Sequence, residues 1–480
     1  MKKLILSLCF VSALGCARNP VTGKRQIVLV SESQEIAMGR DSDSQVQREY
    51  GVADNRALQT YVQTLGQKLS RVSHRPSLEW HFTVVDSPVV NAFAIPGGYV
   101  YITRGILAYL ATEAELAGVM GHEIGHVTAR HSVRQMTRQE LAQLGLGVGS
   151  VLSPGVGQLG NLAGSGLGLM FLRFSRDDER EADRLGVEYA ARAAYDPRQV
   201  SNFFDVLGRL SSASDRQTIP GWLSTHPDPP QRVDATRMQA EQWIQMLGLT
   251  EDRMQTNRDA FLHAIDGLVF GDNPREGFVE AGHFYHPELQ FQLDFPSGWK
   301  TENTREAVFA VAPQQAAQIS LTIARVPRGT TADAYVRSLA SRGMNPQTAM
   351  DVRIHGYNAA LATYMLRGQP GQALGILAGF IEYRNQIVEI VGVSPNLRAF
   401  GAAMESSIRS FDEISDERIL GVQPDRLRIY TAIEGDTLSG LARRNNNTRV
   451  SADDLGILNR MAVDQPITPG RLVKIVEKGM

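Results

Sequence analysis

The sequence predicts a multidomain chain: a mainly helical region with a small sheet, then an antiparallel α+β module, then a small β-α-α-β unit. Its 480 residues exceed the usual size of one domain. Apolar residues recur with helical spacing over most of 31–265, whereas strand-like runs such as "LQFQLDF" and "ISLTIARV" dominate 274–412. We therefore expect domains at 51–265, 279–414 and 425–477.

Composition excludes some classes of partner and gives no sign of wholesale disorder. Hydrophobic residues make up 43% of the chain and charged residues 21%, which is typical of globular protein. The formal net charge is −2, so the chain lacks the basic excess that binding to a polyanion requires. We expect no nucleic-acid partner.

Residues 1–15 have the pattern of an export signal peptide. Two lysines precede a short apolar run, which is too short to span a bilayer. Cys16 follows Gly15 and resembles a bacterial lipoprotein processing site, although Ala13 stands where that pattern prefers leucine. A plain secretory signal is the alternative. With lipidation at Cys16, segment 16–50 would be a lipid-anchored N-terminal segment with a first helix.

This N-terminus predicts a periplasmic protein, and Ala17 resembles the sorting signal that directs a lipoprotein to the outer membrane. Cys9 is the only other cysteine and lies within the signal. A mature chain would therefore contain no disulfide and no zinc site built from thiolates.

The stretch "GHEIGHVTARH" contains the first candidate metal ligands. Thr112 and Glu115 form a capping-box pattern, and no proline occurs from 113 to 136, so one continuous helix is predicted. His122 and His126 then lie one turn apart on the same face and could bind one ion, with Glu123 rotated towards a water molecule. His131 would point to the opposite side. The alternative is a helix with two solvated histidines.

A second segment, "FSRDDEREADRLG", supplies the candidate third ligand. Glu179 and Asp183 are four residues apart and share a helix face, whereas Glu181 points elsewhere. We predict Glu179 as a zinc ligand and Asp183 as the acceptor that orients a ligand histidine. The alternative is a surface helix with interleaved ion pairs.

Together with "THPDPPQR", these motifs resemble the gluzincin zinc metalloprotease family that includes the prenyl-protein endopeptidases, HtpX and BepA-like periplasmic lipoproteins. The resemblance covers about 31–247 and implies a zincin-type metalloprotease domain, α+β with a small edge-strand sheet, that holds one Zn²⁺ per chain. It implies His122, His126 and Glu179 as ligands, Glu123 as general base and Asp183 as their support. His226 would be a fourth ligand that keeps the site latent or, with Arg232, a group that stabilises the transition state.

The preceding "NAFAIPGGYVYITRGIL" resembles the family's strand beside the active-site helix. An exposed edge strand binds extended peptides through main-chain hydrogen bonds. A strand paired on both sides is the alternative. The predicted substrate-binding residues are Asn91, Phe93, Gly98, Val100 and Tyr101. The glycine-rich segment 144–170 is expected to form a lid or a hairpin at the membrane surface, with a transmembrane hairpin as the alternative.

The last unit resembles a LysM module through Gly435-Asp436-Thr437-Leu438, Leu458-Asn459 and Pro469-Gly470. This resemblance implies peptidoglycan as a partner, with a spacer or docking role as the alternative. The 279–414 module is similar to PsbP/Mog-like domains, which suggests docking to protein. The expected function is a zinc endopeptidase that cleaves unfolded or misassembled envelope proteins. The alternatives are a chaperone-like assembly factor with a latent site and a peptidoglycan-directed zinc amidase.

Overall fold

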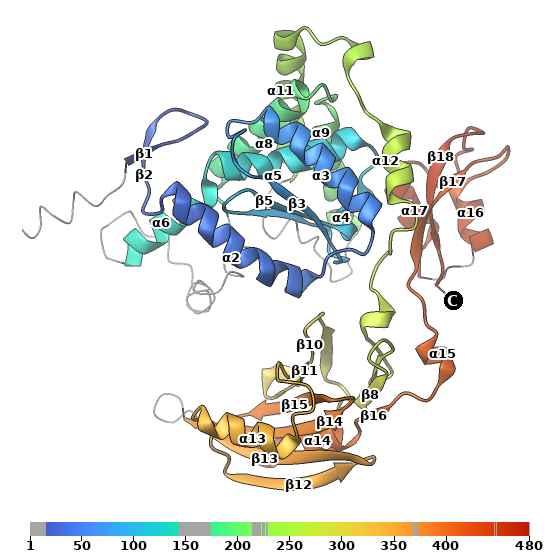
Figure 1. Cartoon of the computed structure of the whole chain (residues 1–480). Helices are drawn as coiled ribbons and strands as arrows, with labels where there is room; N and C mark the ends of the chain where they lie inside the picture. Colours follow the sequence, from blue (N-terminus) through green and yellow to red (C-terminus); the bar gives the residue numbers. More distant parts are fainter. Residues whose placement is uncertain are drawn as a thin grey trace, which may run out of the picture. The chain divides into compact units, whose positions relative to one another are not determined.

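The computed structural model describes residues 16–143, 174–213, 222, 226, 229–367, 373–445, 447 and 449–479. These residues form two compact units: unit 1 combines the chain up to Asp272 with Asp425–Lys478, and unit 2 contains Asn273–Pro424 (Figure 1). The predicted signal peptide and the glycine-rich segment 144–170 lie outside the described residues. No described helix is both long enough and apolar enough to cross a membrane.

Unit 1 begins with a short hairpin and two helices. Ser31 caps the first of these helices, where its side chain and that of Gln34 form a complete capping box. Its buried Glu35 pairs with Arg75 at 2.7 Å and with Arg130 at 2.9 Å, which fixes this helix against the rest of the unit. The elements are β1 (Cys16–Arg18), β2 (Arg25–Ile27), α2 (Glu32–Tyr50) and α3 (Arg56–Arg71).

A three-stranded sheet follows, and its strand order corrects the expected edge. Its strands are β3 (His81–Val85), β4 (Ala92–Ile95) and β5 (Tyr99–Thr103). The order is β3-β5-β4, with β5 parallel to β3 and antiparallel to β4. The turn between β4 and β5 contains Gly97 and Gly98 at φ +87° and +95°. Strand β5 is therefore central, and β3 and β4 are the two outer strands.

The remaining helices of the first part of unit 1 surround a fully buried helix, α5. All 16 residues of α5 are buried, and its polar side chains outside the site, Glu113, Glu115 and Thr128, are hydrogen-bonded to other elements. The predicted continuous helix is wrong at its C-terminal end, because α5 stops at Thr128 and Arg130 adopts a left-handed φ of 57°. The helices are α4 (Arg104–Tyr109), α5 (Glu113–Thr128), α6 (His131–Gln143), α8 (Arg176–Arg192), α9 (Gln199–Ala213), α11 (Pro229–Leu247) and α12 (Arg258–Ile265), with a 3-10 turn at Glu251–Arg253.

The C-terminal module packs into unit 1, although the sequence analysis treats 425–477 as a separate domain. Its hydrophobic residues join the same core as those of α3, α5 and α8. Two cations add polar contacts: Arg460 pairs with Glu115 of α5, and the buried Lys474 donates to the Ala108 and Leu110 carbonyls at the end of α4. The module consists of β17 (Arg426–Thr431), α16 (Leu438–Asn445), α17 (Ala452–Asn459) and β18 (Leu472–Glu477), with β17 and β18 antiparallel.

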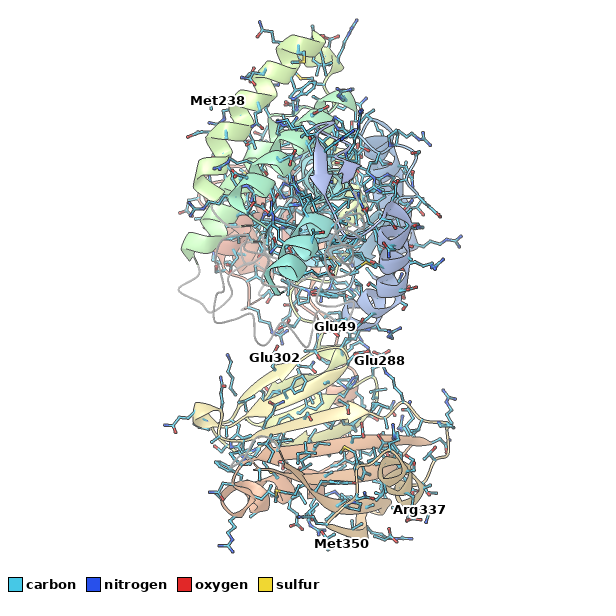
Figure 2. The ribbon with its side chains drawn as sticks, turned by 90° about the vertical axis from the view of Figure 1, so that its left-hand side faces the viewer. Glu49, Met238, Glu288, Glu302, Arg337 and Met350 are labelled. Atoms are coloured by element: carbon cyan, nitrogen blue, oxygen red, sulfur yellow. The ribbon has the colours of Figure 1, made fainter. Side chains whose placement is uncertain are left out.

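Unit 2 is built on a seven-stranded antiparallel sheet of order β12-β13-β14-β15-β11-β10-β9. Helices α13 and α14 cover opposite faces, because they pack against alternate residues of the strands such as Ala360 and Leu361. A hairpin at Arg384-Asn385 joins β14 to β15, and both of these residues have positive φ. On the outer strand β12, Met350 is 55% exposed (Figure 2).

A second, four-stranded sheet completes unit 2 in the order β16-β8-β7-β6. The strands of unit 2 are β6 (Phe278–Glu280), β7 (His283–His286), β8 (Phe291–Asp294), β9 (Lys300–Asn303), β10 (Ala307–Val311), β11 (Gln318–Ile323), β12 (Thr348–Ile354), β13 (Tyr357–Arg367), β14 (Ala373–Tyr383), β15 (Gln386–Ser394) and β16 (Asp412–Glu413). Its helices are α13 (Ala332–Ser341), α14 (Leu397–Arg409) and α15 (Glu417–Leu420), with 3-10 turns at Pro274–Glu276 and Pro313–Gln315.

Candidate metal centre

Helix α5 brings the two motif histidines together inside unit 1. Thr112 caps the helix by accepting from the Glu115 backbone N–H, while the Glu115 carboxylate accepts from Ala111 rather than from the cap residue itself. His122 and His126 share a face, and their Nε2 atoms lie 3.0 Å apart. Both side chains are about 2% exposed, which excludes the alternative of two solvated histidines.

Helix α8 adds two carboxylates from the opposite side. Ser175 begins it with a capping box to Asp178, and Glu179 follows within the first turn. Each Glu179 oxygen lies 3.6 Å from one imidazole, Oε2 from His122 Nε2 and Oε1 from His126 Nε2. Asp183, one turn further on, has Oδ1 2.9 Å from His122 Nδ1. The alternative of a solvated surface helix therefore fails for this face of α8.

Glycines allow the two helices to approach closely enough for these contacts. A Cβ atom added to Gly121 of α5 would lie 3.0 Å from the Gly186 carbonyl oxygen of α8. A Cβ added to Gly186 would lie 3.0 Å from the His122 backbone nitrogen. Gly121 thus meets a glycine on the other helix, and this contact sets the distance between the imidazoles and Glu179.

His226 completes the cluster from a distant part of the chain. Its Nδ1 lies 2.9 Å from Glu179 Oε1 and 3.3 Å from His122 Nε2. The His226 ring is stacked on Trp222 at 4.3 Å between centroids, and Trp222 donates its backbone N–H to the Val90 carbonyl. His226 therefore lies among the side chains of α5 and α8 that form the cluster.

The donor atoms fit a tetrahedral metal ion. The nitrogens of the three histidines and the oxygens of Glu179 are 2.9–3.6 Å from the neighbours given above. Zinc bonds of about 2.0–2.1 Å place tetrahedral ligands roughly 3.3 Å apart. In addition, Glu123 Oε1 is buried, has no hydrogen-bond partner among the described residues and lies 3.7 Å from His226 Nε2. A buried carboxylate oxygen without a partner fits a site that receives water or substrate.

Burial and charge set the protonation of these groups. Burial lowers the pKa of His122 to about 4, so the imidazole is neutral, as a metal ligand must be. Burial, reinforced by the Glu179 charge, raises the pKa of Glu123 well above its ordinary value. Burial opposes ionisation of Asp183, but Arg232 and the His122 hydrogen bond lower its pKa to about 2.

Comparison with protein families identifies the domain that holds this cluster. Residues 56–240 match the model of peptidase family M48, and residues 430–476 match the LysM domain. The chain carries an M48 peptidase domain. The resemblances to a zinc metalloprotease family and to LysM are thereby confirmed.

Curated relatives of the M48 domain include the beta-barrel assembly-enhancing proteases of Yersinia pestis and Escherichia coli K12. They are 35% and 33% identical over 46% and 48% of this chain, and over 47% and 48% of their own lengths. The mitochondrial metalloendopeptidase OMA1 of Arabidopsis thaliana is 32% identical over 41% of this chain and 40% of its own. The chain thus spans about half the length of these relatives.

A solved structure, the cyanobacterial PsbP (CyanoP) of Synechocystis sp. PCC 6803, matches with 15% identity and a TM-score of 0.24. The match covers 29% of this chain and 96% of that one. A TM-score this low supports no conclusion about fold or function. The predicted PsbP/Mog-like character of 279–414 stays a prediction.

The predicted substrate residues of the M48 domain are placed differently from expectation. Val100 and Tyr101 are fully buried on β5, which is paired on both sides, so the predicted edge strand is wrong for them. Gly98 lies in the preceding turn, where an added Cβ would be 2.4 Å from the Glu79 carbonyl. Phe93 is on β4, an outer strand, although its side chain is buried, and Asn91 immediately precedes that strand.

Arg232, from α11, has a different environment from the one expected of a free transition-state donor. Its guanidinium makes two bonds to Asp183, at 2.6 and 2.8 Å, and stacks over Phe204 at 4.2 Å. Its Nη1 lies 3.3 Å from Glu179 Oε2. Arg232 therefore fixes both carboxylates of α8, and this role was not predicted.

His131 and Glu181 are contacts that sequence reasoning missed. His131 was expected to point away, yet its Nδ1 lies 2.8 Å from His126 Nδ1, and its Nε2 lies 3.1 Å from Glu181 Oε2. The cause is the break at Arg130, because a continuous helix would have carried residue 131 round to another face. A histidine five residues after a ligand histidine was the available signal.

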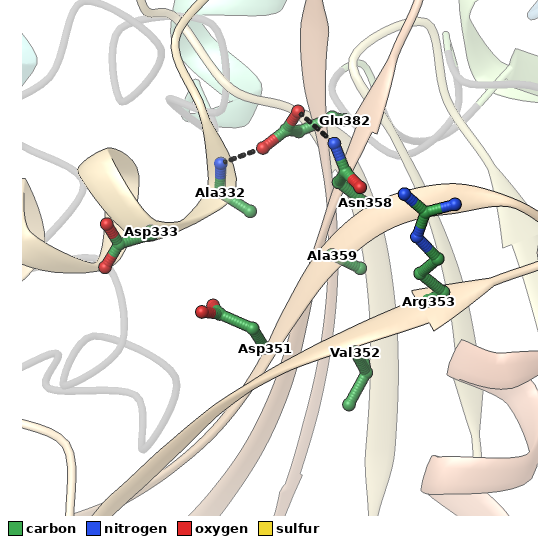
Figure 3. A pocket seen from close by; sticks show the side chains of 8 residues that line it. All are labelled: Ala332, Asp333, Asp351, Val352, Arg353, Asn358, Ala359 and Glu382. Carbon is green, nitrogen blue, oxygen red and sulfur yellow. Dashed lines mark hydrogen bonds between the residues drawn. The ribbon is translucent and has the colours of Figure 1, made fainter.

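Unit 2 has a pocket of its own, of about 400 Å³. Its Glu382 accepts from the Ala332 backbone N–H at 2.8 Å and from the Asn358 amide at 3.4 Å (Figure 3). The lining residues are Ala332, Asp333, Asp351, Val352, Arg353, Asn358, Ala359 and Glu382. This lining contains no imidazole, so the pocket differs in chemistry from the cluster in the M48 domain.

Proposed function

We propose that this chain is a zinc-dependent endopeptidase of the bacterial cell envelope that cleaves unfolded or misassembled envelope proteins. One observation carries the proposal: the donor atoms of His122, His126 and Glu179 converge in a buried cluster inside an M48 domain. The names of its relatives, which include a protease and a metalloendopeptidase, support peptide-bond hydrolysis.

The residues around the cluster have distinct tasks in this proposal. A zinc ion bound there would polarise the scissile carbonyl and make water a stronger acid. Glu123 is held against β4 by a bond from the Ala94 backbone N–H, which fixes its carboxylate where it can take a proton from water and pass it to the leaving amine. Asp183 and Arg232 keep the ligands oriented.

His226 has two roles in the proposal, one at rest and one during turnover. At rest its Nδ1 occupies the fourth donor position, and a site with four protein ligands leaves no position open for water. Activity then requires His226 to withdraw. After withdrawal, a ring N–H of His226 would donate to the developing oxyanion. We favour His226 over Arg232 for this role, because the Arg232 guanidinium is already bound to Asp183 through two hydrogen bonds.

This closed arrangement favours a second candidate function, an assembly factor whose protease is latent most of the time. The endopeptidase and the assembly factor would use the same site, and they differ in the fraction of time that His226 is bound to the metal ion. Of the two outer strands, β4 is the one that would hold an extended substrate, because its Ala94 contacts Glu123.

Location and partners follow from the sequence features outside the M48 domain. The signal-like N-terminus and Cys16 support a periplasmic protein tethered to the outer membrane. The LysM domain supports binding to peptidoglycan. A peptidoglycan-directed amidase remains the competing enzyme class, and it is decided by the assay below.

The test compares casein and murein digestion by the full chain, with and without a chelator. We expect casein cleavage that a chelator abolishes, no murein cleavage, and no activity in Glu123→Gln, which keeps the ligands. His226→Ala should raise casein cleavage when the resting site is closed. Murein cleavage, or casein cleavage undiminished in Glu123→Gln, contradicts the proposal.

A further inference from the structure

His126 and His122 differ in the group that their Nδ1 atoms contact. Asp183 contacts His122 Nδ1 directly, whereas the Nδ1 of His126 faces another imidazole, His131 Nδ1, at 2.8 Å. His131 is fully buried, and its other nitrogen faces Glu181 Oε2 at 3.1 Å and Asp178 Oδ1 at 3.8 Å. The Nδ1 atom of His122 thus contacts a carboxylate directly, whereas the Nδ1 atom of His126 is connected to a carboxylate through the His131 ring.

When His126 is a metal ligand, only one arrangement of protons satisfies the hydrogen bonds between His126, His131 and Glu181. A histidine that binds a metal through Nε2 keeps its proton on Nδ1. His126 Nδ1 therefore donates to His131 Nδ1, which must accept. His131 then has its proton on Nε2 and donates to Glu181, because a carboxylate only accepts.

Neighbouring groups hold His131 in this orientation. Arg134 binds both carboxylates behind it, Asp178 at 2.5 Å and Glu181 at 3.2 Å. The Phe174 ring is stacked on His126 at 4.2 Å between centroids. The left-handed Arg130 turns the chain so that His131 begins α6 facing His126.

We infer that His131 is a positioning residue for the metal site: it holds His126 with Nε2 directed at the ion, and Glu181 fixes the proton on His131. This inference rests on the proposed zinc site and deepens it. Partners that orient ligand histidines contribute about 10–100-fold to metal affinity. The loss of His131 should therefore weaken zinc binding without any change in a ligand.

Two nearly isosteric variants of the full chain test the inference by chelator competition for zinc. His131→Asn keeps an oxygen acceptor where Nδ1 stands, and His131→Leu does not. We expect His131→Leu to bind zinc at least about tenfold more weakly, and His131→Asn to recover most of that loss. Glu181→Ala should lie between them, and it also serves if His131→Leu does not fold.

His74→Phe is the control, because His74 contacts the Tyr189 hydroxyl at 2.8 Å and lies outside the cluster. Thermal unfolding of the metal-free proteins is measured in parallel, and His74→Phe should change stability but not zinc affinity. Equal zinc affinity in wild type, His131→Leu and Glu181→Ala overturns this inference and leaves the proposed function intact. Equal losses in His131→Leu and His131→Asn would show packing rather than acceptance of the His126 proton. A wild type that binds no zinc overturns both.

Discussion

Asp183 connects the ligand histidine to the buried cation of the site. Its carboxylate bonds to His122 Nδ1 at 2.9 Å and makes two bonds to Arg232. Arg232 is only 5% exposed, so its ion pair with Asp183 is shielded from water, and loss of either charge leaves the other one buried without this partner. A single carboxylate therefore sets the orientation of one ligand and compensates one buried charge.

Asp183→Asn should weaken zinc binding and destabilise the fold together. We expect a loss of about 10–100-fold in zinc affinity, because the amide orients His122 less well. Leaving Arg232 without its charge partner should cost about 3–5 kcal/mol of unfolding free energy. Chelator competition and urea unfolding measure the two effects. Asp177→Asn, on the exposed side of the same helix, is the control, and equal behaviour of the two variants would contradict the role of Asp183.

At the residue scale, the sequence predicts the groups whose positions depend on helix geometry alone. The spacing of His122, Glu123 and His126, and of Glu179 and Asp183, fixes the face that each occupies. The sequence could not predict the position of His131, because that position depends on the left-handed φ of Arg130. No local sequence pattern indicates this conformation for an arginine. The contacts of Arg232 depend on the packing of α11 against α8, which local sequence does not encode.

At the scale of elements, the contact between α5 and α8 determines whether the ligands meet. It is a backbone-to-backbone approach: a Cβ on Gly186 would lie 3.0 Å from the His122 nitrogen and 3.2 Å from the Gly118 oxygen. Backbone atoms yield less readily than a flexible side chain. A side chain at this position must therefore move the helices apart.

Gly186→Ala should lower both stability and zinc affinity, despite alanine's better helix propensity. The propensity gain is about 1 kcal/mol, and the overpacking cost of about 1–3 kcal/mol exceeds or cancels it. Separation of the helices would also move Glu179 away from the imidazoles. Gly208→Ala on α9 is the control, because no atom of the described residues lies within 4 Å of an added Cβ there, and the better helix propensity of alanine should stabilise this variant. Urea unfolding and chelator competition measure both variants, and a stabilised Gly186→Ala with unchanged zinc affinity contradicts this account.

Element types were predicted better than element partners. The helices around both motifs were predicted from local periodicity and from the capping pattern at Thr112. The error at Val100 and Tyr101 arose from pairing. Strand β5 pairs in parallel with β3, and such pairing is a long-range choice with no local signature.

At the scale of the whole molecule, the chain leaves unit 1 after Asp272 and returns at Asp425. The two crossing points are adjacent, because Phe270 donates its backbone N–H to the Asp425 carbonyl at 2.8 Å and Val269 forms a bridge with Arg426. The LysM module thus completes unit 1. Its contact with Glu115 joins residues 345 positions apart, so the sequence could not predict it.

Replacement of 273–424 by a short Gly/Ser linker should leave unit 1 folded, because its ends already meet. We expect an unfolding temperature of unit 1 and a zinc affinity close to those of the full chain. Truncation at residue 424 is the matched comparison, and it should lower the unfolding temperature strongly by exposing the shared core. Thermal unfolding of the two forms measures the difference. A truncated form as stable as the full chain would contradict the claim that the LysM module shares the hydrophobic core of unit 1.

Lys474 gives unit 1 a defined dependence on pH. Burial lowers its pKa from about 10.5 to about 7, a shift that Arg460 and Arg258 support and Glu115 opposes. Between these values the unfolded chain holds a proton that the folded chain lacks, so stability rises with pH by up to about 1.4 kcal/mol per unit. Below about pH 7 this contribution is flat. Urea unfolding from pH 7 to 10 should show a shallower rise in Lys474→Met, and identical slopes contradict the assignment.

The most direct test of the metal site is the zinc content of the purified full chain after dialysis against a weak chelator. We predict one zinc ion per chain in the wild type and a large loss in Glu179→Ala, which lacks the anionic ligand. A wild type without stoichiometric zinc, or a Glu179→Ala form that retains all of it, would contradict the claim that the imidazoles of α5 and the carboxylate of α8 share one ion.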